Sequence, residues 1–286
     1  MSTTEIQRVR SADGTEIAYR RRGEGPSLIF VDGAFCTMTM GPGKTLVPAL
    51  ADRYTTFVYD RRGRGKSGDA STYEVGREVE DLAAIIAAAG GSAYVFGHSS
   101  GAVLALEAAR AGVPVAALAL YEPPFVLDDT RPPVPVDLAE HLARLADAGR
   151  GRAVVRTFMD QAIRTPKVIS IAMSIMPGAG RLSKIAHTVA YDATIMSAYQ
   201  RGTPLPDGAF SAQRIPTLLI AGAKSPQWIQ TSCEMLAASV PQAELARLAR
   251  QSHMVKAAAT APAIDRFFAT ITSPVPPAPV VHRPAS

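Results

Sequence analysis

The segment Gly-His-Ser-Ser-Gly at residues 97–101 has the residue types and the spacing that nucleophilic catalysis requires. It follows an apolar run at residues 93–96 and precedes a helical pattern at residues 102–110. Between a strand and a helix, Gly-x-Ser-x-Gly is typical of a sharp turn that lifts the serine hydroxyl above a sheet, and a Cβ on either glycine would collide with neighbouring elements. Ser99 is therefore the candidate nucleophile. The N–H of Ser100, at the start of the helix, can bind an oxyanion.

A serine hydroxyl needs a base to act as a nucleophile, and histidine commonly supplies it. The chain has five histidines, and three of them lie in a helical region or in the C-terminal tail: His141, His187 and His282. His98 lies within the serine turn, where we expect its side chain to point away from Ser99. His253 lies in a loop between the last strand pattern and the last helical pattern, from which it can reach over the strand ends. His253 is therefore the candidate base.

Short apolar runs alternate with helical patterns along most of the chain, which indicates βαβ units around a mostly parallel sheet. Strands are expected at residues 16–20, 27–31, 55–59, 93–96, 115–121, 216–221 and 244–248, and helices at residues 74–89, 102–110, 231–240 and 257–271. Between them lies a region with helical periodicity only. We therefore expect an α/β core at residues 1–126 and 213–272, interrupted by a helical cap insertion at residues 127–212 over the carboxyl ends of the strands, where ligands bind in such sheets. The proline-rich residues 273–286 are expected to form a disordered tail that packs little.

The serine turn and four further segments resemble the α/β-hydrolase fold family over about residues 15–271. The further segments are Val-Asp-Gly at residues 31–33, Tyr-Asp-Arg-Arg-Gly-Arg-Gly-Lys-Ser-Gly at 59–68, Pro-Thr-Leu-Leu-Ile at 216–220 and Ser-His at 252–253. The resemblance implies an α/β-hydrolase fold with the activity of a serine hydrolase. It also implies that the N–H of Gly33 or Ala34 completes an oxyanion hole with that of Ser100. The arginine-rich segment is a structural turn in the family.

The acid that would orient the histidine departs from the usual family pattern. The loop at residues 221–226, which normally carries this acid, contains no carboxylate. Glu122 instead closes the strand that follows the nucleophile helix, a position from which certain haloalkane dehalogenases and the fungal zearalenone lactonase take their acid. Glu122 is therefore the expected acid of the triad. Its alternative role is a rim salt bridge to the insertion, and Asp128 and Asp129 are the alternative acids.

Residues expected to contact the substrate come from two regions. The insertion carries apolar stripes in which Met173 and Met176 are flexible enough to line a cavity, although most of these side chains should bury the insertion against the core. Met38, just after the oxyanion loop, is expected to line the same cavity. Asp32 stands where the family often has histidine, and it either binds a substrate hydroxyl or holds its loop. With no arginine cluster in the insertion, the sequence predicts a neutral, hydrophobic small-molecule ester or lactone as substrate. The alternative is a non-hydrolytic protein of this fold, either a biosynthetic cyclase or a ligand-binding module.

The composition excludes several other classes of protein. The 286 residues carry a net charge of +5 with no block of like charges, so a nucleic-acid partner is not expected. The polar N-terminus lacks a signal peptide and no apolar run could span a membrane, so we expect a cytoplasmic protein without a membrane partner. Cys36 and Cys233 lack metal-ligand spacing, and no dinucleotide fingerprint is present. Neither a metal nor a cofactor is therefore expected.

Overall fold

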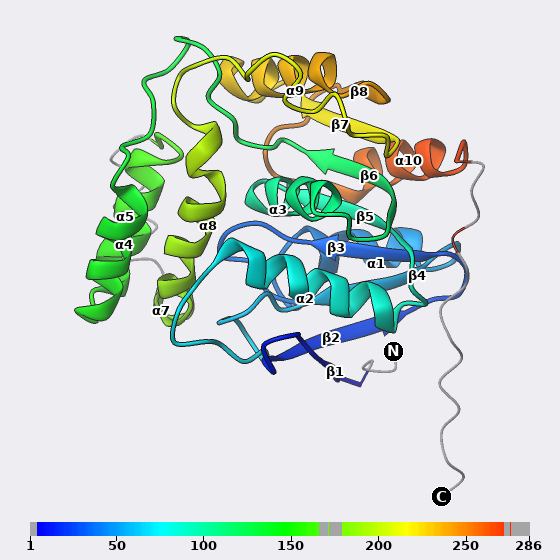
Figure 1. The fold of residues 1–286 in the computed structure, drawn as a ribbon, viewed down its shortest axis with the longest axis horizontal. Helices are drawn as coiled ribbons and strands as arrows, with labels where there is room; N and C mark the ends of the chain where they lie inside the picture. Colours follow the sequence, from blue (N-terminus) through cyan, green and yellow to red (C-terminus); the bar gives the residue numbers. More distant parts are fainter. Residues whose placement is uncertain (1–4, 166–170, 172–178, 272–274, 276–286) are drawn as a thin grey trace, which may run out of the picture.

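A computed structural model describes residues 5–165, 171, 179–271 and 275 of this chain (Figure 1). Its strands form one eight-stranded sheet in the order β1-β2-β4-β3-β5-β6-β7-β8. The strands are β1 (Gln7–Arg10), β2 (Glu16–Arg22), β3 (Ser27–Val31), β4 (Thr55–Tyr59), β5 (Ala93–His98), β6 (Val115–Tyr121), β7 (Thr217–Gly222) and β8 (Ala243–Leu248). β2 pairs antiparallel with β1 and β4, and all other neighbours pair parallel. The predicted α/β fold with a mostly parallel sheet is confirmed.

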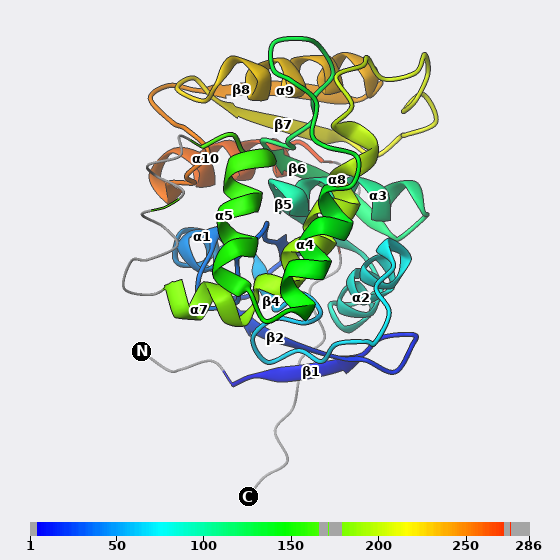
Figure 2. The same ribbon diagram turned by 90° about the vertical axis from the view of Figure 1, so that its left-hand side faces the viewer.

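Helices cover both faces of this sheet (Figure 2). α1 (Pro42–Leu50) and α10 (Ala257–Phe268) pack on one face, and α2 (Val75–Ala88), α3 (Ser100–Arg110) and α9 (Gln227–Ser239) pack on the other. β3 is buried along its whole length because helices cover it from both sides, which explains its uninterrupted apolar sequence. The chain thus builds two hydrophobic cores, one on each face.

Two elements were not expected from the sequence. β1 has the polar sequence Gln-Arg-Val-Arg and lies at the edge of the sheet, where a strand needs little apolar surface. α1 starts at Pro42, a favourable first helical position, but Pro48 lies within it and obscures its periodicity. Both elements are stabilised by tertiary packing rather than by a strong local pattern.

Between β6 and β7 the described residues form helices and loops without a strand. The helices are α4 (Leu138–Asp147), α5 (Gly151–Gln161), α7 (Ala179–Lys184) and α8 (Val189–Met196), with short 3₁₀ helices η1 (Ala186–Thr188) and η2 (Ser197–Tyr199). We refer to the described part of residues 138–199 as the helical insertion. Its helices stand beside the end of the sheet toward which β6 points, and Figure 2 views them from that side. The boundaries of the cap at residues 127 and 212 stay a prediction.

The tail prediction needs one correction. Val275 is only 4% exposed and packs in the core cluster that contains α1 and α10, so the tail does not pack as little as expected at this position. Burying the apolar side chain of Val275 is favourable in free energy, even though the segment around it is rich in proline. The remaining residues of the predicted tail, 273, 274 and 276–286, lie outside the described residues.

Candidate active site

Ser99 lies at a strained turn between β5 and α3. Its backbone angles, φ 56° and ψ −126°, fall where residues other than glycine are rare. A Cβ on Gly97 would lie 2.6 Å from the Cα of Ala102, and one on Gly101 would lie 2.0 Å from the carbonyl oxygen of Val31. The expectation that both glycines are required by close approach is therefore confirmed. The turn holds Ser99 at the carboxyl end of the central strand β5.

The loop after β3 packs directly against this serine. A Cβ on Gly33 would lie 2.9 Å from the Cβ of Ser99, so the loop backbone and the serine turn are in contact. In the part of the chain that the structure describes, neither the Ala34 N–H nor the Ser100 N–H donates to a backbone acceptor. The residues predicted to form the oxyanion hole, Gly33 or Ala34 with Ser100, are therefore brought to the two sides of Ser99. Their role as oxyanion donors stays a prediction.

Glu122 and His253 meet at the ends of β6 and β8. The Oε2 atom of Glu122 lies 2.8 Å from Nδ1 of His253, and the carboxylate is fully buried. Its other oxygen, Oε1, accepts hydrogen bonds from the Gly222 N–H at 2.7 Å and from the Ser225 hydroxyl at 2.5 Å. A carboxylate can only accept, so Nδ1 of His253 donates to it, and this tautomer leaves Nε2 as the ring atom that can act as a base.

The sequence did not indicate how Glu122 is held. Gly222 and Ser225 belong to the loop at residues 221–226, which lacks the usual acid and here supplies hydrogen-bond donors to an acid from the neighbouring strand. The carboxylate contacts His253 rather than the insertion, unlike the alternative rim salt bridge.

Neither alternative acid lies beside the histidine. Asp128 accepts hydrogen bonds from the N–H and hydroxyl of Thr130, at 3.1 and 2.6 Å, within its own loop. Asp129 is exposed to solvent. The structure therefore brings Glu122, and not these two aspartates, to the candidate base.

A cavity of about 400 Å³ opens above Ser99 and His253, and both residues line it. The insertion contributes part of its wall from α5, α7 and the segment after α5. The larger apolar residues around the cavity are Phe35, Met40, Phe158, Met159, Ile163, Leu182, Met254 and Val255. Among the described lining residues none is Asp, Glu, Lys or Arg. The site therefore combines a serine and a histidine with an apolar chamber.

His98 lies closer to the site than the sequence suggested. We expected its side chain to point away from Ser99, but it is buried and lines the same cavity. Its Nε2 donates to the carbonyl oxygen of His253 at 3.1 Å, because a carbonyl can only accept. Burial, with a smaller contribution from the charge of His253, lowers the pKa of His98 to about 3, so its ring is neutral at pH 7. His98 thus supports the loop that carries the candidate base.

One predicted substrate contact, Met38, lies in the core and does not line the cavity. Met38 is only 5% exposed and belongs to the core cluster with Leu46 and Leu50, because its N–H donates to Oδ1 of Asp60 at 2.7 Å and directs the chain inward. Met40, two residues later, lines the cavity instead. Met173 and Met176 lie outside the described residues.

Asp32 holds its loop and does not line the cavity. Its Oδ1 and Oδ2 atoms accept from the Gly43 N–H, at 2.9 and 3.2 Å, in the first turn of α1. Asp32 is not among the described residues that line the cavity. Of the two roles considered for Asp32, the structure therefore favours the loop contact, and the predicted substrate contact is corrected.

The buried carboxyl group of Asp32 is expected to make the stability of the folded state depend on pH. Burial raises the pKa of Asp32 from 3.8 to about 7, although Gly43, Arg64 and Arg61 oppose the shift. The folded state therefore binds a proton that the unfolded state releases, so this group reduces stability as the pH rises from about 4 to about 7. Asp32→Asn should lose less stability than the unsubstituted chain over this range. Urea unfolding at several pH values tests this, and parallel pH dependences in the two proteins would contradict it.

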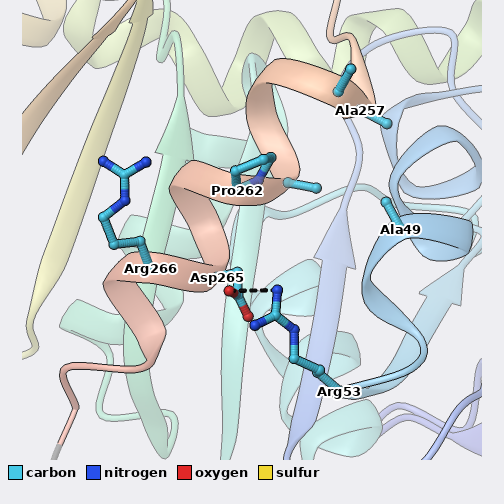
Figure 3. Close-up of a pocket in the computed structure, with 8 residues that line it drawn as sticks. Ala49, Arg53, Ala257, Pro262, Asp265 and Arg266 are labelled. Carbon is cyan, nitrogen blue, oxygen red and sulfur yellow. Dashed lines mark ion pairs between the residues drawn. The ribbon is translucent and has the colours of Figure 1, made fainter.

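Within the described ranges, no three His, Cys, Asp or Glu side chains gather as a metal site, and no helix combines the length and apolar content needed to cross a bilayer. A second hollow, of about 420 Å³, lies between α1 and α10 (Figure 3). It is bordered by the ion pair of Arg53 with Asp265, 2.7 Å apart, and contains none of the predicted site residues.

Known proteins resemble this chain in sequence and structure. The sequence model of a family described as "Alpha/beta hydrolase family" matches residues 30–264. An alpha/beta hydrolase from Sphaerobacter thermophilus is 43% identical, with a TM-score of 0.84, over 92% of this chain and 100% of that one. A 2-(acetamidomethylene)succinate hydrolase from Mesorhizobium japonicum is 37% identical over 32% of each chain. An N-formylmaleamate deformylase from Pseudomonas putida is 36% identical over 40% of this chain and 44% of its own. The chain thus matches less than half the length of these two curated relatives.

Proposed function

This chain belongs to the alpha/beta hydrolase family, and from that premise we propose that it is a serine hydrolase of neutral, hydrophobic carboxylic esters or lactones. The observation that carries the proposal is the 2.8 Å contact of Glu122 with Nδ1 of His253, at a cavity that His253 shares with Ser99. A buried carboxylate that orients a histidine beside a strained serine is the arrangement that serine nucleophiles need.

The reaction follows from these positions. Nε2 of His253 takes the proton of the Ser99 hydroxyl as the serine oxygen attacks the ester carbonyl carbon. Glu122 stabilises the imidazolium, and the N–H groups of Ser100 and of Gly33 or Ala34 bind the oxyanion. The C–O bond to the alcohol then breaks, and the alcohol leaves with the proton from His253. Water, activated by the same histidine, hydrolyses the acyl-enzyme and restores the free serine.

The cavity supports the substrate class. Its described wall is mostly apolar and contains no Lys or Arg that could pair with a phosphate or a carboxylate. Desolvating an anionic substrate in such a chamber costs free energy that no partner offsets. Flexible methionines such as Met40 and Met159 suit bulky, irregular ligands. A neutral acyl or lactone ring of moderate size therefore fits the site best.

An acyl-chain series tests the substrate class. We expect kcat/KM for p-nitrophenyl esters to rise from acetate to longer acyl groups, because each buried methylene adds about 0.8 kcal/mol of favourable binding free energy. For anionic esters we expect kcat/KM to be low. Met159→Lys should lower kcat/KM for the longer esters about 10-fold or more, because it places a charge in the wall. Val136→Lys is the matched control, because Val136 is exposed and does not line the cavity. A preference for acetate or for anionic esters would contradict the proposal.

A covalent probe tests the reaction class. A fluorophosphonate should label Ser99, and mass spectrometry of the digested protein should locate the adduct there, because only an activated serine attacks phosphorus readily. Failure to label would favour the alternative of a ligand-binding module.

The substrate panel should include N-formylmaleamate and 2-(acetamidomethylene)succinate, after which the two curated relatives are named. Faster turnover of either than of hydrophobic esters would overturn the proposed substrate class.

A further inference from the structure

A buried cluster of charges connects the helical insertion to the start of α3. Asp192, on α8, is fully buried and accepts three hydrogen bonds from the core. The donors are the Ser100 hydroxyl at 2.6 Å, Nη1 of Arg61 at 2.7 Å and Nη2 of Arg64 at 2.6 Å. We call these four residues, together with Glu78, the Asp192 cluster. Through it, a side chain of the insertion contacts the residue that follows the candidate nucleophile.

The same cluster reaches the loop on the other side of Ser99. Arg64, while bound to Asp192, donates through Nη1 to the carbonyl oxygen of Gly33 at 2.7 Å. One carboxylate therefore connects the two backbone segments that would supply oxyanion donors. The Ser100 segment is held directly, and the Gly33 segment is held through one guanidinium.

The charges of the cluster balance. Arg61 binds Glu78 through two hydrogen bonds, of 2.6 and 2.7 Å, which leaves Asp192 as the carboxylate facing Arg64. Burial by itself would raise the pKa of Asp192, but Arg64 and Arg61 hold it below its ordinary value. Asp192 is therefore ionised at neutral pH, and its charge-assisted hydrogen bonds are short and directional. Such a buried network is weak evidence for stability but fixes the relative positions of its members.

We propose that Asp192 is a positioning residue that holds the Ser100 and Gly33 segments at the separation an oxyanion requires. The insertion then contributes to transition-state binding as well as to the cavity wall. Small displacements of donors weaken the stabilisation of a developing charge, because the donors must meet the oxyanion and not the ground-state carbonyl. The inference rests on the proposed function, since it concerns the oxyanion of that reaction.

Two variants test separately the contacts of Asp192 with the arginines and its contact with the Ser100 hydroxyl. Asp192→Asn retains an acceptor but removes the charge that binds both arginines, and we expect kcat to fall about 10- to 100-fold with little change in KM. Ser100→Ala keeps its backbone N–H and leaves both arginine contacts of Asp192 in place, and we expect about a 10-fold loss. If Asp192→Asn fails to fold, Ser100→Ala decides the question, because it perturbs no ion pair.

The deciding readout is affinity for a transition-state analogue. An alkyl boronic acid forms a tetrahedral adduct with Ser99, whereas a long-chain alcohol occupies the cavity without forming an oxyanion. Affinity for the boronic acid should fall by the same factor as kcat/KM in each variant, and affinity for the alcohol should stay within about two-fold. A purely structural role would weaken both ligands or neither.

Asp69→Asn is the matched control. Asp69 also connects α8 to the core, through the Tyr191 hydroxyl at 3.2 Å, but it has no contact with the Gly33 or Ser100 segments. This variant should keep kcat and boronic acid affinity within about two-fold of the unsubstituted chain. Equal losses in Asp69→Asn and Asp192→Asn would overturn the proposal in favour of general docking of α8.

One more outcome would overturn the positioning role: folded Asp192→Asn and Ser100→Ala variants that both retain kcat and boronic acid affinity. Overturning the positioning role would not affect the proposed function, which fails separately if Ser99→Ala remains active.

Discussion

Ser99→Ala should abolish turnover of hydrophobic esters, lowering kcat about 10⁴- to 10⁶-fold, while the protein stays folded. The loss is large because the hydroxyl is the proposed nucleophile, and the neighbouring hydroxyl, that of Ser100, is bound to Asp192. Ser99 already adopts φ 56°, and alanine adds no bulk at this position, so melting temperature should change by only a few degrees. Steady-state kinetics and thermal unfolding of the same preparation measure both effects.

Thr45→Val is the control for this experiment. Thr45 also carries a hydroxyl at the cavity, but that hydroxyl donates to the carbonyl oxygen of Gly41 at 3.2 Å and has no histidine partner. Activity of this variant should stay within a few-fold of the unsubstituted chain. If Ser99→Ala kept more than a few per cent of the activity, the assignment of the nucleophile would be wrong.

Glu122→Gln should lower kcat by about 10³- to 10⁴-fold with little change in stability. The glutamine amide can donate to Nδ1 of His253, which places the ring proton on Nε2 and removes the base. The imidazolium also loses its buried counter-charge, whereas Oε1 can still accept from Gly222 and Ser225. Kinetics over a range of pH and a melting curve test the change.

Asp128→Asn provides the comparison. Asp128 was the alternative acid in the sequence, but its carboxylate binds Thr130 in the described structure. We expect its replacement to leave kcat within about two-fold. A loss in Asp128→Asn as large as that in Glu122→Gln would refute Glu122 as the acid. So would a folded Glu122→Gln variant that keeps most of its activity.

Local sequence determined the serine turn and the strands around it. Gly97 and Gly101 are required because nearby backbone leaves no space for a Cβ, and this constraint depends on a few neighbouring elements. The buried central strands were recognisable because helices cover both of their faces and leave no position for Asp, Glu, Lys or Arg. Glu122 could be selected because it closes the strand after the nucleophile helix, and the family resemblance implies that some members take their acid from this strand.

Only the tertiary structure decided which side chains meet across long distances in the chain. Met38 and Met40 differ by two residues, yet packing buries the first in the core and places the second at the cavity. The sequence did not place His98 at the cavity, because the carbonyl group that it binds comes from the distant loop of His253. Asp192 carries no local signal at all, since its partners lie in segments that meet only after α8 packs on the core. Spacing along a chain predicts contacts within a turn or a strand end, whereas a buried polar contact between distant segments depends on how whole elements pack.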